Sequence, residues 1–109
     1  MFAAYVTFQL DDRFDPEMLR KISEQARSIF VGLPQLRNKY FTIDAANRRA
    51  VNVYIWESEA AARAFFDEAL LQKVSELYGV KPRLEFAEVA AFVDNSELTQ
   101  ELGENPDFL

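Results

Sequence analysis

The sequence predicts a single α+β domain with the element order β-α-β-β-α-β. Period-two alternation of apolar residues marks four strand segments, and two stretches with helical spacing lie between them. The length of 109 residues fits one domain with one core. If both crossovers pack their helices on one face, the sheet is antiparallel with spatial order 4-1-3-2, which is the ferredoxin-like arrangement.

The first strand and the first helix have clear local signals. Residues 2–10 alternate an apolar set with a mixed set, as in a strand with one apolar face. After a turn at 11–14, Asp15 can cap a helix whose first position is Pro16. This helix should continue to about Phe30. Its apolar stripe has three-four spacing and comprises Met18 or Leu19, Ile22, Ala26, Ile29 and Phe30.

The second and third strands are expected to form a hairpin. Strand residues 36–44 and 50–57 flank a polar loop at 45–49. In the second strand the alternation puts Leu36, Asn38, Tyr40 and Thr42 on one face and Arg37, Lys39, Phe41 and Ile43 on the other. In the third strand an aliphatic set alternates with a larger set that can form hydrogen bonds. The two sets are Val51, Val53 and Ile55 against Asn52, Tyr54 and Trp56.

The last two elements are less regular. Ser58 can cap a second helix, and this helix, or a further short one, should end at Gly79. Residues 83–93 predict a fourth strand, in which a bulge would reconcile Glu85 and Glu88 with an apolar inner face. We therefore expect a domain at 1–95 and an acidic tail at 96–109.

Composition excludes several kinds of site. The chain has no His and no Cys, so it cannot form a Ser-His-Asp or Cys-His nucleophile, a zinc site with His or Cys ligands, or a His- or Cys-ligated haem. Only an all-oxygen site for a hard cation would remain, and the two local acid pairs do not indicate one. The three glycines are isolated, so there is no phosphate-binding loop. We expect no cofactor and no metal.

Charge and hydropathy restrict the partners. Of the net charge of −6, residues 1–93 carry −1 (12 bases, 13 acids) and the last sixteen residues carry −5. No basic face is concentrated enough to predict nucleic-acid binding. No apolar run approaches the roughly 20 residues of a membrane span, and the N-terminus lacks a basic leader. We expect a cytoplasmic protein without a membrane or nucleic-acid partner.

The predicted sheet leaves one face without helices. The face with Val51, Val53 and Ile55, or its opposite, would then be a sizeable apolar surface. Monomers rarely expose such a surface. We therefore expect a homodimer in which the two sheets pack face to face about a twofold axis.

Several phrases resemble a known family. They are Gly32-Leu33 with Lys39-Tyr40-Phe41 and Asp44, Tyr54-Ile55-Trp56-Glu57-Ser58, Ala62 to Phe66, Tyr78-Gly79-Val80 with Pro82, and Val93-Asp94-Asn95. Together they are similar to the YdhR-like family of candidate monooxygenases, in the dimeric α/β-barrel superfamily. The resemblance covers residues 1–95. It implies a homodimer, a pocket between sheet and helices in each subunit, and oxidation of an aromatic or phenolic substrate by O₂ without metal or flavin.

The resemblance also implies site residues. Some superfamily members have an Asn and a Trp four residues apart on one strand face in the pocket, and Asn52 and Trp56 reproduce that spacing. We expect these two to hold the substrate oxygen and ring. Tyr54, Lys39 or Arg83 would handle the proton or the negative charge, and Arg83 and Phe66 would contact the substrate.

Each candidate also has a purely structural interpretation. Trp56 and Phe66 can simply fill the core, and Asn52 near a hairpin can be solvated. The hydroxyl of Tyr54 can point to water. Lys39 can extend over its apolar neighbours to solvent, and Arg83 can pair with Glu85.

Two main functions therefore remain open. One is a cofactor-independent monooxygenase acting on a small aromatic or phenolic substrate. The other is a non-catalytic homodimer that binds a small ligand or a protein. The second needs Trp56 near a pocket but no activated base. An RNA-binding variant of the fold would need a basic face that the sequence lacks.

Overall fold

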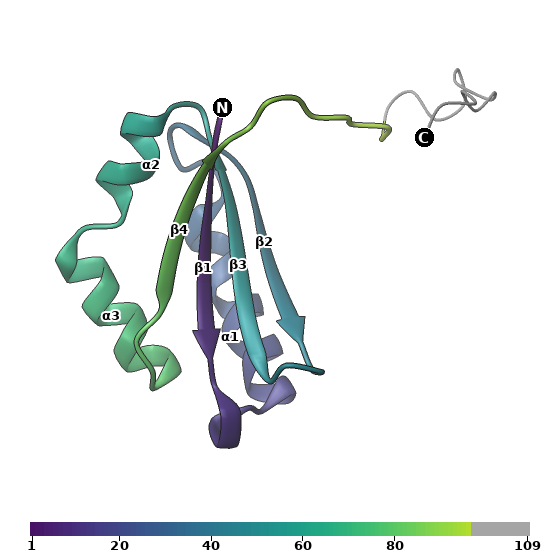
Figure 1. The fold of residues 1–109 in the computed structure, drawn as a ribbon, viewed down its shortest axis with the longest axis vertical. Helices are drawn as coiled ribbons and strands as arrows, with labels where there is room; N and C mark the ends of the chain where they lie inside the picture. Colours follow the sequence, from purple (N-terminus) through teal and green to yellow (C-terminus); the bar gives the residue numbers. More distant parts are fainter. Residues whose placement is uncertain (97–109) are drawn as a thin grey trace.

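The computed structural model describes residues 1–96, so the tail predicted at 96–109 lies almost entirely outside the described residues. Four strands form one antiparallel sheet in the order β2-β3-β1-β4, the ferredoxin-like order expected from the sequence (Figure 1). The elements are β1 (Phe2–Gln9), a 3₁₀ turn (Asp11–Arg13), α1 (Pro16–Phe30), β2 (Leu36–Asp44), β3 (Arg49–Trp56), α2 (Glu59–Phe65), α3 (Glu68–Tyr78) and β4 (Arg83–Glu88).

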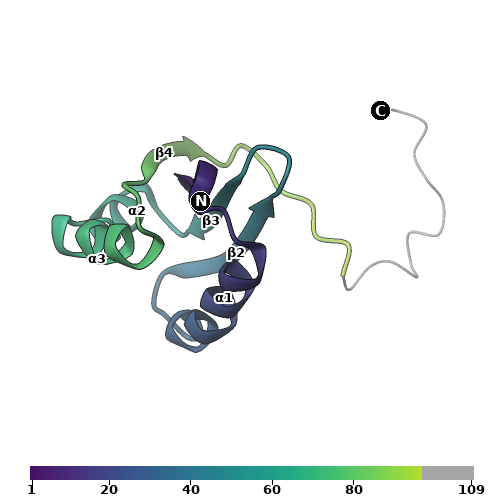
Figure 2. The same cartoon turned by 90° about the horizontal axis from the view of Figure 1, so that it is seen from below.

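The helices lie on one side of the sheet (Figure 2). Capping residues fix where they begin. The side chain of Asp15 accepts hydrogen bonds from the first turn of α1, and that of Ser58 from the first turn of α2. The segment after Ser58 is two helices, because Asp67 caps α3 separately. Gly79, with φ at 81°, ends α3 in the left-handed conformation.

The two faces of β3 differ as the alternation predicted. Asn52, Tyr54 and Trp56 point toward the helices and are 5, 4 and 2% exposed. They join the core around Phe8, which is fully buried. The three aliphatic residues of β3, Val51, Val53 and Ile55, are half-buried on the face without helices.

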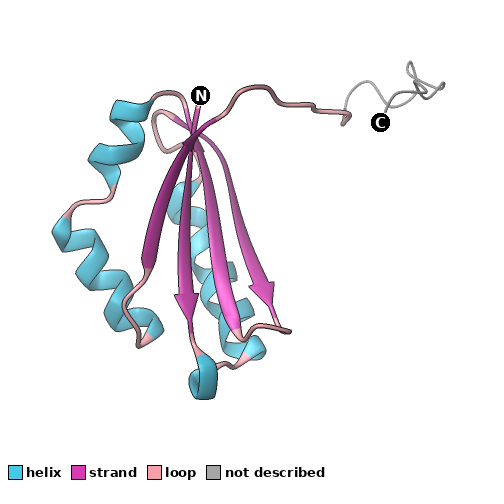
Figure 3. Ribbon diagram, viewed as in Figure 1, coloured by secondary structure: helices cyan, strands magenta, loops and turns pink. Residues whose placement is uncertain are grey.

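The prediction for the fourth strand was wrong in its length. β4 ends at Glu88, not at residue 93, and the proposed bulge in it is absent. The reason is its partner: within residues 1–96 β4 pairs only with β1, and Phe2, the first residue of β1, lies opposite Glu88. Residues 89–96 leave the sheet as extended chain (Figure 3), with Phe92 and Val93 62 and 84% exposed.

A bulge occurs instead near the start of β2. Leu36 pairs with Trp56 whereas Asn38 pairs with Ile55, so Arg37 is an extra residue in the ladder. The bulge turns Leu36 toward the helices, and the prediction that it shares a face with Asn38 and Tyr40 was wrong. From Asn38 onward the alternation is regular, and Lys39 and Phe41 face the helices as expected.

The helix α1 uses a narrower apolar stripe than the sequence suggested. Leu19 is buried, and Ile22, Ala26 and Phe30 are half-buried. Met18 and Ile29 are 56 and 68% exposed, because they lie at the margins of the stripe. None of the helices in residues 1–96 combines the length and the apolar composition that crossing a membrane requires.

Candidate functional site

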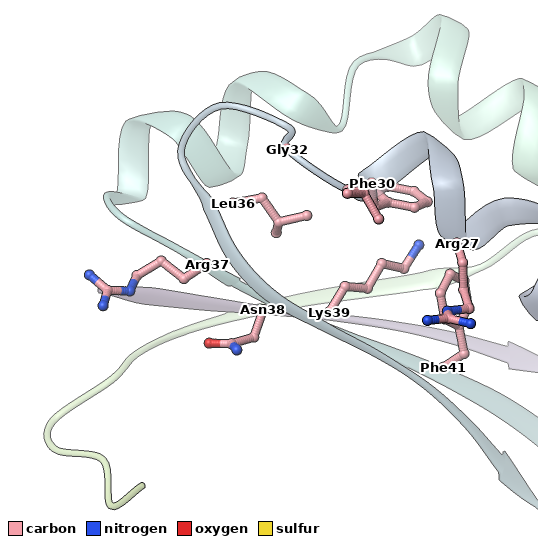
Figure 4. A pocket seen from close by; sticks show the side chains of 9 residues that line it. Arg27, Phe30, Gly32, Leu36, Arg37, Asn38, Lys39 and Phe41 are labelled. Carbon is pink, nitrogen blue, oxygen red and sulfur yellow. The ribbon is translucent and has the colours of Figure 1, made fainter. Parts of the chain in front are cut away.

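The most distinctive polar group is the amine of Lys39. Lys39 extends from β2 toward the C-terminal end of α1 (Figure 4). Its Nζ lies 3.4 Å from the ring centroid of Phe30, 4.1 Å from that of Phe41 and 4.3 Å from that of Tyr54. Nζ also donates a hydrogen bond to Tyr54 Oη at 2.9 Å. Register explains this contact, because Lys39 and Tyr54 are direct partners across the β2–β3 ladder.

Burial changes the protonation of this pair. Desolvation lowers the pKa of Lys39 from 10.5 to about 7. Desolvation also raises the pKa of Tyr54, and the nearby Tyr78 raises it further. At neutral pH the pair therefore combines an amine that is unprotonated in a large fraction of molecules with a neutral phenol. Such an amine can accept a proton or attack an electrophile, and the phenol can donate a hydrogen bond to it.

Lys39 borders a pocket between α1 and the start of β2. The pocket has a volume of about 350 Å³. Its apolar wall includes Phe30, Leu36 and Phe41, and none of the described residues that line it is acidic. Its charged lining residues besides Lys39 are Arg27 and Arg37, and Figure 4 shows the guanidinium of Arg37 directed away from Lys39. The lining is therefore basic, although the body as a whole is nearly neutral. The lining residues are Arg27, Phe30, Val31, Gly32, Leu36, Arg37, Asn38, Lys39 and Phe41.

The row formed by Asn52, Tyr54 and Trp56 lies deeper than this pocket and does not appear in its lining. Aromatic rings pack around the row. The centroid of Trp56 lies 4.9 Å from that of Phe65, and the centroid of Tyr54 lies 5.0 Å from that of Phe66. Tyr54 is thus the member of the row that connects the deep cluster with Lys39.

Two polar groups of the row contrast in their partners. Asn52 Nδ2 donates to Tyr78 Oη at 3.3 Å, so the amide is used within the core. The indole Nε1 of Trp56 is buried and has no hydrogen-bond partner among residues 1–96. A buried donor without a partner is costly, and an acceptor atom of a ligand would relieve that cost.

The structure brings together only part of the candidate set. Lys39 and Tyr54 touch, and Asn52 and Trp56 flank Tyr54 on the same strand face. Phe66 is buried in the core against Tyr54 and does not line the pocket described above. Arg83 does not join the group. It pairs with Thr7 in the sheet, lies on the face without helices, and forms a salt bridge with Glu85 at 3.3 Å.

Two further residues contribute that were not among the candidates. Phe30 supplies the closest ring over the Lys39 amine, and Tyr78 holds the Asn52 amide. Phe30 was recognisable in the sequence only as a core residue of α1, because the contact depends on how α1 crosses β2. In residues 1–96, no group of three or more acidic residues is arranged to hold a metal ion.

Comparisons with known proteins agree on the fold. No family model matches the chain, and no curated protein matches it by sequence. A monooxygenase of Streptomyces coelicolor from the gene ActVA-Orf6, solved with nanaomycin D, is 23% identical, with a TM-score of 0.62 over 87% of this chain and 92% of its own. A candidate antibiotic biosynthesis monooxygenase of Bordetella bronchiseptica is 16% identical, with a TM-score of 0.63 over 83 and 97%.

A third similar structure has a different activity. The haem degrader MhuD of Mycobacterium tuberculosis, solved with two haems in its active site, is 17% identical, with a TM-score of 0.61 over 86% of this chain and 100% of its own. At these identities the likeness establishes the ferredoxin-like fold. This fold is used for more than one reaction, so the activity has to be argued from the residues of the site.

Proposed function

We propose that this protein is a cofactor-independent monooxygenase acting on a small aromatic or phenolic substrate. The observation that carries the proposal is the Lys39 amine, which lies among three aromatic rings, contacts Tyr54 and borders a pocket. It supplies the base that a chain without His would otherwise lack. In support, a structural neighbour from Streptomyces nogalater, SnoaB, is described as a cofactor-independent oxygenase, with 12% identity and a TM-score of 0.61.

The proposed reaction needs few protein groups. The neutral Lys39 amine removes a proton from an activated C–H or O–H of the substrate, and the resulting carbanion passes one electron to O₂. Recombination of the two radicals gives a peroxide that loses water. For an anthrone, the methylene group and O₂ become a ketone and water, so atoms and electrons balance. Arg27 at the pocket would stabilise the anion formed in the first step.

The deeper row gives the substrate a place for its oxygen atom. Trp56 Nε1 is a buried donor without a partner in the described part of the chain, and Asn52 lies on the same strand face. In the proposed complex, a ring enters from the pocket, displaces Phe30 or Phe65, and directs an oxygen toward these two donors. Arg83 has no role in this model, because it lies on the opposite face of the sheet.

The proposed enzyme is a homodimer. The face without helices carries Val51, Val53 and Ile55, and beyond it the extended residues 89–96 expose Phe92 and Val93. Packing two such faces together would cover these side chains. Analytical ultracentrifugation should give twice the mass of one chain. The Phe92→Ser, Val93→Ser double variant should weaken the association of the two subunits. A monomer at micromolar concentration would contradict this assembly.

Anthrone oxidation tests the catalytic proposal. Wild-type protein should consume one O₂ per anthrone and form anthraquinone, at a rate that rises with pH around a midpoint near 7, because the base must be unprotonated. Lys39→Met should reduce the protein-dependent rate at least about tenfold. Lys73→Met removes an exposed lysine on α3 and should have no effect.

The controls distinguish catalysis from binding. The Asn52→Ala, Trp56→Ala double variant should lose the rate as well, and its fold is checked by circular dichroism. Equal rates of anthrone oxidation in wild type, Lys39→Met and the double variant would refute the proposed monooxygenase activity. Saturable quenching of Trp56 fluorescence without O₂ consumption would favour the alternative, a non-catalytic protein that binds a flat aromatic ligand in the same place.

A further inference from the structure

The surroundings of Lys39 also favour a second kind of chemistry. The ring centroids of Phe30, Phe41 and Tyr54 lie within 4.3 Å of its Nζ, and within residues 1–96 its one hydrogen bond is to the phenol of Tyr54. Among residues 1–96 no carboxylate lines the adjoining pocket, so no ion pair there would hold the amine as an ammonium ion. A desolvated lysine beside cationic groups is the arrangement that activates amines as nucleophiles toward carbonyl carbon.

We propose that Lys39 captures an aromatic aldehyde or ketone in the α1–β2 pocket by forming an imine through its Nζ. This goes beyond the proposed oxygenation and does not depend on it, because the step needs no O₂. The same amine would act as a nucleophile toward a carbonyl compound rather than as a base.

The step is balanced without an oxidant or a reductant. The Nζ lone pair attacks the carbonyl carbon, a C–N bond forms, and the carbonyl π bond becomes a C–O single bond. One N–H proton moves to the oxygen, which gives a carbinolamine. Loss of a second N–H proton and departure of the hydroxyl as water then leave the C=N bond. Tyr54 Oη, 2.9 Å from Nζ, can relay the proton that the leaving hydroxyl needs.

The pocket also indicates which carbonyl compounds would be preferred. Phe30, Leu36 and Phe41 provide apolar walls for a ring, and Arg27 contributes a positive charge beside Lys39. Arg27 is 3.4 Å from Glu24, but this pair is exposed and weak, so the guanidinium remains available to an anion. An aromatic carbonyl compound that carries a carboxylate should therefore be captured faster than its uncharged counterpart.

The chain contains its own comparison. It has four lysines, and the other three, Lys21, Lys73 and Lys81, are exposed. An ordinary lysine is unprotonated at pH 7 in only about one molecule in a few thousand. If the site is as we propose, Lys39 should be modified ahead of these three even though they are easier to reach.

The test is reductive trapping with a defined probe. The whole protein is incubated without O₂ with 4-carboxybenzaldehyde and sodium cyanoborohydride at pH 7, and modified peptides are measured by mass spectrometry. We expect Lys39 to be labelled at least about tenfold faster than each exposed lysine. Benzaldehyde should label Lys39 more slowly, and Arg27→Gln should remove the difference between the two aldehydes.

Two variants separate chemistry from folding. Lys39→Arg keeps a long cationic side chain and should lose the rapid labelling. Tyr54→Phe keeps the amine and the ring stack but should slow capture severalfold. Equal labelling of all four lysines, or labelling of the exposed lysines alone, would overturn the proposal. Anaerobic capture without anthrone oxidation would leave this inference standing and refute only the oxygenase.

Discussion

Replacing Lys39 by Met should change how the stability of the protein depends on pH. The substitution keeps an unbranched side chain of similar length among Phe30 and Phe41, but removes the amine that burial has partly deprotonated. The buried hydroxyl of Tyr54 loses its partner in the variant, at a cost of about 1 kcal/mol that does not depend on pH in the neutral range. The informative quantity is therefore the pH dependence and not the stability at one pH.

The sign follows from the two protonation states. The unfolded lysine holds its proton up to a pKa of 10.5, whereas the folded lysine holds it only up to about 7. Between these values unfolding takes up one proton, so the free energy of unfolding rises with pH by up to about 1.4 kcal/mol per pH unit. From pH 7 to pH 9 the Lys39 amine alone should raise the free energy of unfolding of the wild type by about 2 kcal/mol. Below pH 7 both states are protonated and the contribution levels off.

Urea denaturation at pH 7, 8 and 9 measures this. The fluorescence of Trp56, the single and buried tryptophan, reports unfolding, and protein concentration is held constant because a dimer would couple stability to it. The stability difference, Lys39→Met minus wild type, should shift by about 2 kcal/mol in favour of the wild type between pH 7 and pH 9. Lys73→Met, on the exposed surface of α3, should follow the wild type. If the free energies of unfolding of Lys39→Met and wild type changed with pH in parallel, the conclusion that burial lowers the pKa of Lys39 would be refuted.

Three further changes test the fold. Phe8→Ala should lower the free energy of unfolding, measured by urea denaturation, by about 3–5 kcal/mol. The Phe8 ring is fully buried, and its centroid lies 3.8 Å from that of the stacked Tyr78 ring. Ser58→Ala should cost about 1 kcal/mol through the loss of the α2 cap, and Ser58→Asp should restore most of it; an unchanged urea midpoint would show that the cap is dispensable. Gly79→Ala should cost about 1–2 kcal/mol, because φ is 81° and the new methyl would lie 3.0 Å from Arg13 Nη1; Gly79→Asn should cost less, and the reverse order would refute the argument from φ.

Local signals were sufficient for most of the fold. The alternation in residues 2–10 and 50–57 and the caps at Asp15 and Ser58 depend on neighbouring residues alone, and all four were confirmed. The end of β4 was predicted wrongly because it depends on another strand. Val89 donates its backbone N–H to the carbonyl of Met1, which precedes the first residue of β1.

The site was predictable only in its separate parts. Period-two spacing correctly put Asn52, Tyr54 and Trp56 on one face of β3, and Lys39 beside Phe41 on β2. That Lys39 meets Tyr54 follows from the β2–β3 register, which the sequence did not define. The pairing of Arg83 with Thr7, which places it away from this group, likewise follows from the β1–β4 register.

The extra residue in β2, Arg37, lies at a position where the sheet can tolerate a deletion. Because Leu36 and Asn38 are matched to the adjacent β3 positions Trp56 and Ile55, deleting Arg37 would close the ladder without moving any other side chain to the wrong face. Because Arg37 also lines the pocket between α1 and β2, changing or deleting it would alter the pocket wall while the pairing of β2 with β3 stays intact. At such a position the shape of a cavity can vary from one sequence to another at little cost to the sheet.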